Sequence, residues 1–89
     1  MTYRIEVERR AGKELARLPR QAQKRIATAI DALAYAPRPV GCRPVREAEK
    51  GAYRVRVGDY RVIYVILDDE RVVIVVRVGR RNERTYENL

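Results

Sequence analysis

The segment spanning residues 53–61 constrains the fold of this chain more than any other, because it reads Tyr-Arg-Val-Arg-Val-Gly-Asp-Tyr-Arg. Apolar or aromatic residues alternate with arginine at period two, which predicts a β-hairpin with two different faces. The Gly-Asp pair is a two-residue connection of the kind that closes tight hairpins. In that hairpin Arg56 lies directly opposite Arg61, with Arg54 on the same face. Like charges opposite each other destabilise a sheet, so we expect an anion to bind there.

Hydrophobic spacing along the rest of the chain predicts a single α+β domain that spans residues 1–89. We expect the order β-α-α-β-β-β, a mainly antiparallel four-stranded sheet with a helical hairpin on one face. A loop containing Pro and Gly separates the second helix from the second strand. The expected strands and helices cover residues 3–8, 10–18, 20–34, 52–57, 60–67 and 71–78.

The two faces of the expected sheet differ in chemistry. The helices should cover the face that carries the valines and tyrosines of the hairpin. The other face begins with arginines and continues with Ile63, Val65 and Leu67, which this assignment leaves exposed. An exposed apolar strip of that kind would need a protein partner. The pattern does not decide which face Arg77 occupies.

The net charge of +8 comes almost entirely from arginine, with 17 arginines against 3 lysines. Arginine offers a planar set of donors that matches phosphate. A basic surface of this size therefore points to nucleic acid or to an acidic protein partner, with a merely solubilising surface as the alternative.

Absent residue types exclude several chemistries. The chain contains no His, no Ser and no Trp, so serine triads and histidine acid–base catalysis are excluded. The single cysteine, Cys42, makes a zinc site implausible and allows no internal disulfide. The acidic residues at 68–70 are better explained by a turn than by a metal site. We expect no metal and no other cofactor.

Membrane insertion and export are not expected. No apolar run approaches the roughly 20 residues of a membrane-spanning helix. Met1 leads directly into the first expected strand, so no secretory signal is expected. The sequence therefore predicts a cytoplasmic protein.

A basic segment follows the last expected strand. Gly79 allows the chain to turn, and Arg80, Arg81, Arg84 and Tyr86 come next. This tail could return beside the hairpin arginines, or it could be an ordinary solvated tail.

From Tyr53 to Tyr64 the chain resembles the central hairpin of the RelE/ParE superfamily of bacterial toxins. The stretch Arg77-Val78-Gly79-Arg80-Arg81, with Tyr86 beyond it, resembles the ending of the RelE branch. The resemblance covers essentially the whole chain. It implies a toxin of a type II toxin–antitoxin system that enters the ribosomal A site and cuts messenger RNA without a metal. The implied partners are a cognate antitoxin, the ribosome and messenger RNA.

The resemblance also implies roles for particular residues. The basic strand residues of the family fall on Arg54 and Arg56, its two functional arginines on Arg61 and Arg81, and its tyrosine on Tyr86. The basic strand positions are often lysines in that branch. The spacing from Arg81 to the tyrosine is one residue shorter than in some members. Further RNA contacts are expected from three arginines near the end of the chain, Arg77, Arg80 and Arg84.

The expected chemistry uses the 2′-hydroxyl of RNA as the nucleophile, with arginines stabilising the phosphorane. Arginine stays protonated, so Tyr86 is the candidate for the proton of the 2′-hydroxyl, or it stacks on a base. Two other functions stay open for the same fold: a ParE-like poison of DNA gyrase, and a non-catalytic regulator that binds an antitoxin.

Overall fold

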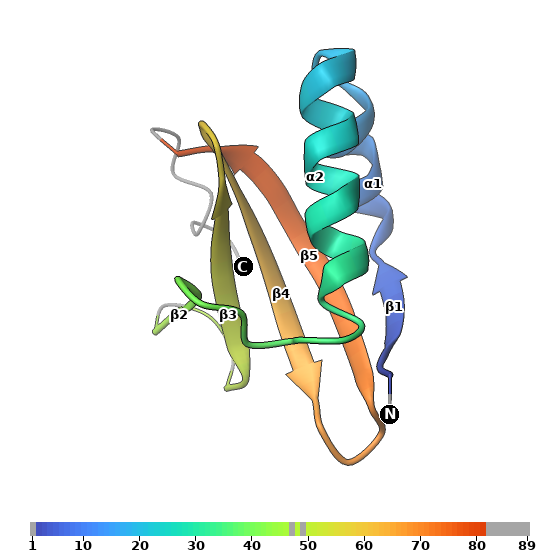
Figure 1. Cartoon of the computed structure of the whole chain (residues 1–89), viewed down its shortest axis with the longest axis vertical. Helices are drawn as coiled ribbons and strands as arrows, with labels where there is room; N and C mark the ends of the chain where they lie inside the picture. The colour runs from blue at the N-terminus through green and yellow to red at the C-terminus, as the bar shows by residue number, and fades with distance from the viewer. Residues whose placement is uncertain (1, 47, 49, 82–89) are drawn as a thin grey trace.

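The computed structural model describes residues 2–46, 48 and 50–81. It confirms the predicted α+β class, the two helices and the four predicted strands, and it adds one short strand (Figure 1). Among the described residues, no helix combines the length and apolar composition needed to cross a bilayer. The elements are β1 Arg4–Val7, α1 Arg9–Ala16, α2 Arg20–Ala32, β2 Arg43–Pro44, β3 Ala52–Val57, β4 Tyr60–Leu67 and β5 Val72–Arg80.

The five strands form one sheet in the order β1-β5-β4-β3-β2. β1 pairs with β5 in parallel, and the other neighbours are antiparallel. The prediction of four strands was wrong by one, because β2 lies inside the segment expected to be a loop. Two residues are too few to show a period-two pattern. Pro44 can occupy β2 because this strand is at the edge of the sheet.

The helical hairpin packs on one face of the sheet (Figure 1). Ile26, Ile30 and Leu33 recur at helical spacing and are buried, as the apolar pattern predicts. They meet a sheet surface that includes Tyr64, which is fully buried. The Tyr64 hydroxyl donates a hydrogen bond to the Pro37 carbonyl at 2.8 Å, and burial raises the pKa of this hydroxyl. This bond ties the segment after α2 to the centre of the sheet.

The opposite face carries a second, smaller apolar cluster. Ile63 and Val65 pack there with Val45 and Ala52, and all four are buried. The expectation that Ile63 and Val65 would be exposed is therefore wrong, and Leu67 is also partly covered. The segment after α2 returns over this face, where the Val45 N–H donates to the Ala52 carbonyl at 2.9 Å. A contact between distant parts of the chain covers this strip.

An ion-pair network anchors the loop after α2 at the end of the sheet away from the β3–β4 turn. Arg38 contacts Asp68 at 2.7 Å, and Tyr3 donates its hydroxyl to the same carboxylate at 2.7 Å. The Arg38 guanidinium also lies over the Tyr53 ring, 5.2 Å from its centroid. The hydrogen bonds from Arg38 and Tyr3 lower the pKa of Asp68 to about 2. The acidic turn thus supplies an anchor for the loop.

Candidate functional site

The β3–β4 hairpin forms in the predicted register. Val57 pairs with Tyr60, and Arg56 lies directly opposite Arg61. Gly58 has φ +59°, a conformation that glycine adopts without strain. The pair beyond the one that closes a two-residue turn is a non-hydrogen-bonded pair, in which the Cα atoms are only about 4.5 Å apart. The two arginines therefore face each other at the closest spacing that a sheet offers.

A second pair of opposed arginines lies beside the first. Arg43 on β2 pairs directly with Arg54 on β3. Sequence reasoning missed Arg43, because β2 was not predicted and its position opposite Arg54 depends on the fold of the preceding loop. Two like-charged pairs therefore follow each other along β3, and like charges directly opposite each other are unfavourable in a sheet.

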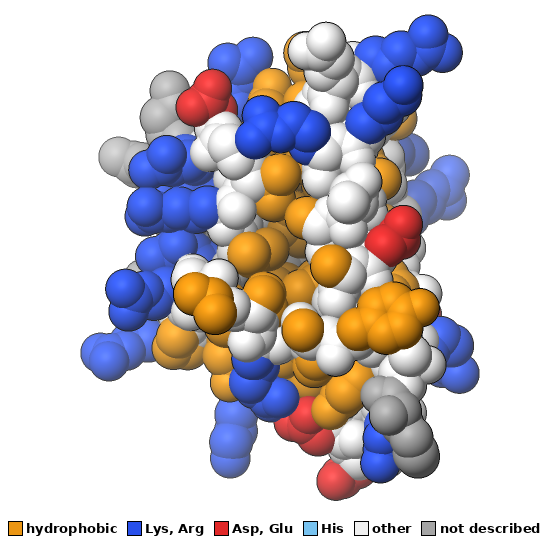
Figure 2. All heavy atoms as spheres, in the orientation of Figure 1, with side chains coloured by type: hydrophobic (Ala, Val, Ile, Leu, Met, Phe, Trp, Pro, Cys, Tyr) orange, Lys and Arg blue, Asp and Glu red, His pale blue; other side chains and the backbone are white. Residues whose placement is uncertain are grey.

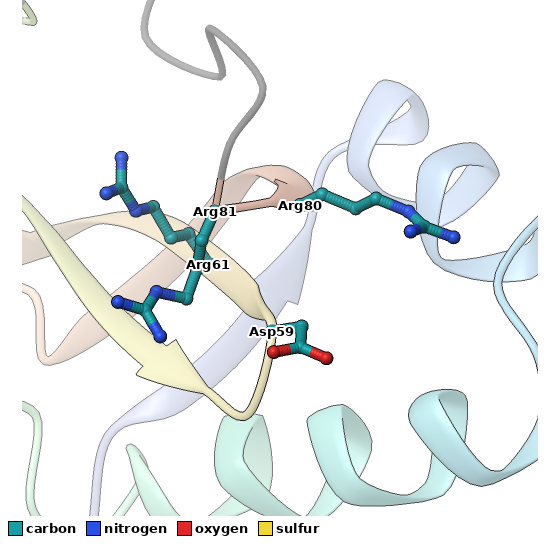
Figure 3. Close-up of a pocket in the computed structure, with 4 residues that line it drawn as sticks. All are labelled: Asp59, Arg61, Arg80 and Arg81. Atoms are coloured by element: carbon teal, nitrogen blue, oxygen red, sulfur yellow. The ribbon is translucent and has the colours of Figure 1, made fainter.

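Arg81 extends this surface past the end of β5. Its N–H donates to the Asp59 carbonyl at 2.8 Å, which holds the end of β5 against the β3–β4 turn. Gly79 lies directly opposite Arg61, and Arg81 is two positions further along, so the two side chains are directed to the same side of the sheet. Figure 3 shows both projecting in the same general direction.

We call this surface the arginine face. Its members lie on the side of the sheet away from the helices. Figure 2 shows blue Lys and Arg side chains gathered on the left of the view, over β2 and β3. The arginine face comprises Arg43, Arg54, Arg56, Arg61 and Arg81.

An open pocket of about 430 Å³ lies at the turn end of the arginine face, and we call it the Arg61 pocket. It is lined by Asp59, Arg61, Arg80 and Arg81 (Figure 3). Arg80 points the other way, toward the helices (Figure 3), with its guanidinium 5.9 Å from the centroid of the Tyr60 ring. The pocket thus presents two guanidinium groups on the arginine face and one behind it.

Arg77 lies apart from the arginine face. A bulge in β5, next to the pairing of Ile63 with Arg77, shifts the register. Arg77 forms a partly buried ion pair with Glu14 of α1 at 3.0 Å, and the same carboxylate accepts the Val78 N–H at 2.9 Å. This ion pair gives Arg77 a structural role that the sequence did not reveal.

The predicted site residues therefore separate into groups. The structure brings Arg54, Arg56, Arg61 and Arg81 together on one face. It places Arg80 on the other side of the sheet and Arg77 against α1. Arg84 and Tyr86 lie outside the described residues.

Comparisons with known proteins match this chain to toxins of type II toxin–antitoxin systems over nearly its whole length. A family model described as the ParE toxin of the type II toxin–antitoxin system parDE matches residues 5–85. A RelE1 protein of Methanocaldococcus jannaschii is 35% identical over 99% of each chain. The toxin RelE of Mycobacterium tuberculosis is 31% identical over 90% of this chain and 82% of that protein.

Solved structures show the same likeness. The archaeal RelE–RelB complex from Pyrococcus horikoshii contains a chain that is 31% identical, with a TM-score of 0.80. The match covers 93% of this chain and 99% of that one. It includes the helical hairpin, the sheet and therefore the elements that carry the arginine face.

Proposed function

The chain belongs to the RelE/ParE superfamily of toxins from type II toxin–antitoxin systems, and we propose that it is a ribosome-dependent endoribonuclease that cuts messenger RNA. The observation that carries the proposal is the arginine face, in which Arg56 lies opposite Arg61 and Arg81 lies beside Arg61. Repulsion between these groups is relieved when a polyanion binds between them. The RelE names of the relatives favour messenger RNA as that polyanion.

The proposed reaction is an internal phosphoryl transfer within the RNA. The 2′-hydroxyl gives up its proton as its oxygen attacks the adjacent phosphorus. The bond to the 5′-oxygen breaks, and that oxygen takes up a proton from water, so no proton is gained or lost overall. The products are a 2′,3′-cyclic phosphate and a 5′-hydroxyl end. Arg61 and Arg81 hold the scissile phosphate and stabilise the charge of the phosphorane, since their positive charge is permanent. One such donor lowers a barrier by about 2.7–4 kcal/mol.

Other residues orient the RNA and move the proton. We assign Arg54 and Arg56 to the RNA backbone beside the scissile phosphate, because both lie on the arginine face. Tyr86 is assigned to the 2′-hydroxyl proton, since no arginine can act as a base at accessible pH. Arg80 and Arg84 stay in the proposal as outer RNA contacts. Arg77 could reach RNA only by giving up its ion pair with Glu14.

The proposal includes a protein partner that restrains the toxin. The relative from Pyrococcus horikoshii is described as a complex of RelE with RelB. We propose that this chain likewise binds a cognate antitoxin, through an amphipathic helix and an extended segment of the antitoxin. An acidic antitoxin would also neutralise the net charge of +8.

A ParE-like poison of DNA gyrase is the second candidate, because the matching family model is the one described for ParE. It would use the same fold without RNA cleavage. The two candidates differ in their cellular effects, since a gyrase poison breaks DNA and leaves messages intact.

Expression of the chain without an antitoxin, followed by mapping of message 5′ ends, tests the proposal. We expect new 5′-hydroxyl ends within translated codons for the unmodified protein and for Arg17→Ala, which removes one exposed charge at the end of α1. We expect at least about a hundredfold fewer ends for Arg81→Ala. Intact messages with DNA breaks would favour the ParE-like function, and full cleavage by Arg81→Ala would refute the assignment of that residue.

A further inference from the structure

A second pocket, of about 350 Å³, lies at the other end of the arginine face. It opens where β2 stops pairing with β3, just past the opposed Arg43 and Arg54. Arg43, Arg54 and Arg56 line it together with Val40, Gly41 and Val55. We call it the Arg43 pocket. Three arginines from two strands thus line a hollow that is large enough for a phosphate group.

The Arg43 pocket is held open by the loop that forms one of its walls. Gly41 has φ +92°, and the Cys42 N–H donates to the Pro39 carbonyl at 3.0 Å, which closes a turn. The hydrogen bond from Tyr64 to Pro37 and the Arg38–Asp68 ion pair hold the start of the loop. The backbone of Arg43 is therefore held in place next to β3 before any ligand arrives, which reduces the entropy lost on binding.

The chemistry of the Arg43 pocket suits phosphate better than bases. The tyrosines at 53, 60 and 64 pack against the helix-side core. Among the described residues, the arginine face has no aromatic ring on which a base could stack. Guanidinium groups match phosphate oxygens in pairs. Recognition here depends on the backbone of the nucleic acid and not on its sequence.

The Arg43 pocket and the Arg61 pocket are separate sites. No residue lines both of them in the described part of the chain. Arg56 lines the first and Arg61 the second, and these two residues are paired directly across β3 and β4. Since adjacent strands are about 4.8 Å apart, Arg43 on β2 is two strand spacings from Arg61 on β4. Each pocket has room for a phosphate group, and a single strand would have to run across β2, β3 and β4 to reach both.

We propose that the Arg43 pocket is a second phosphate subsite, which holds a non-scissile phosphodiester of the RNA strand cut at the Arg61 pocket. The proposal rests on the proposed endoribonuclease function and adds Arg43 as a substrate-positioning residue. It gives the substrate a fixed path over β2, β3 and β4, and it makes affinity depend on strand length and salt.

The test measures binding without cleavage. A short 2′-O-methyl RNA strand lacks the nucleophile, so its affinity can be measured by fluorescence anisotropy at several salt concentrations. We expect Arg43→Ala to weaken binding about three- to tenfold at low salt. The slope of log affinity against log salt should fall by roughly 0.7, the value for one phosphate of a single strand. Arg17→Ala, with the same loss of charge in the helical layer, should leave both quantities nearly unchanged.

A single neutral methylphosphonate, moved along the strand, locates the phosphate. At one non-scissile position the methylphosphonate should weaken binding of the strand to the unmodified protein but not to Arg43→Ala. In a separate assay of cleavage on ribosomes, Arg43→Ala should change kcat less than KM. The proposal is overturned if the unmodified protein does not bind the strand at low salt, if no position is coupled to Arg43, or if Arg43→Ala behaves like Arg17→Ala. It is also overturned if Arg43→Ala weakens only the binding of polyglutamate, which would assign the pocket to an acidic protein. Coupling without cleavage would support the subsite while refuting the endoribonuclease function.

Discussion

The two faces of the central sheet are made by the same strands and have opposite energetics. The face under the helices buries Tyr64 together with valines and isoleucines, and burial of such side chains is what stabilises the fold. The arginine face places like charges directly opposite each other at two adjacent positions. Alternation along the β3–β4 hairpin therefore places an apolar layer under the helices. The other face carries the arginine face near the turn and the smaller apolar cluster around Ile63 and Val65 further along. Substitutions on the two faces should separate stability from activity.

Truncation on the helix face should have the largest effect on stability. Tyr64 is fully buried, so Tyr64→Ala should lower the free energy of unfolding by about 3–5 kcal/mol, as for other large aromatic truncations. Denaturant unfolding followed by circular dichroism measures this loss. Tyr64→Phe is the matched control and should lose about 1 kcal/mol, since the ring stays in place while the hydroxyl that bonds to Pro37 is removed. Equal losses in the two variants would show that packing of the ring contributes little.

Truncation on the arginine face should do the opposite. Arg61→Ala should reduce the rate of message cleavage on ribosomes by about a hundredfold to a thousandfold. The same variant should unfold at an equal or slightly higher free energy, by up to about 1 kcal/mol, because repulsion from Arg56 is relieved. A clear loss of stability would mean that the opposed arginines support the fold and would contradict the contrast between the faces.

The contrast between the two faces can also be tested at Glu14, the residue of α1 that binds Arg77 and Val78 of β5. Its carboxylate accepts hydrogen bonds from Arg77 and from the Val78 N–H. Glu14→Ala leaves both donors without this acceptor, so stability should fall by about 1–3 kcal/mol. Glu6→Ala is the control, since its ion pair with Arg4 is exposed and should contribute little. Thermal unfolding compares the two variants, and equal losses would contradict a structural role for the Arg77 pair.

The smallest effect should appear at acid pH, at the end of the sheet away from the β3–β4 turn. The folded-state pKa of Asp68 is lowered to about 2 by the hydrogen bonds from Arg38 and Tyr3, below the ordinary value of about 3.9 for an unfolded chain. The stabilisation is therefore complete above about pH 5 and is lost as the pH falls toward 2. The unmodified protein should be more stable than Asp68→Asn at pH 6, and the difference should shrink below pH 4. A difference that stays constant down to pH 2 would exclude titration of Asp68 as its source.

Much of the fold follows from patterns that act over a few residues. The period-two alternation of β3 and β4 and the Gly-Asp turn predicted the register that brings Arg56 opposite Arg61. The spacing of Ile26, Ile30 and Leu33 predicted the buried stripe of α2, although the helix ends at Ala32 and not at residue 34. The hairpin register and the buried stripe of α2 each depend on residues close together in the chain, so the sequence pattern is enough to predict them.

Part of the candidate site could not be predicted in this way. Arg43 reaches the arginine face only because the loop after α2 returns to the sheet and is held there through Arg38 and Tyr64. Ile63 and Val65 are covered by Val45 from the same loop. Arg77 is directed toward Glu14 at a bulge that the valine-rich sequence of β5 does not mark.

By itself the amino-acid sequence determined the α+β class, the hairpin and the pairing of two arginines that repel each other, because short-range geometry decides which residues of a tight hairpin meet. Only the tertiary structure decided which further charges join them and which are neutralised elsewhere. The reason is physical. The position of a residue in a loop, or next to a bulge, depends on packing and ion pairs between segments far apart in the chain, and these contacts cannot be predicted from the spacing of apolar residues over a few positions.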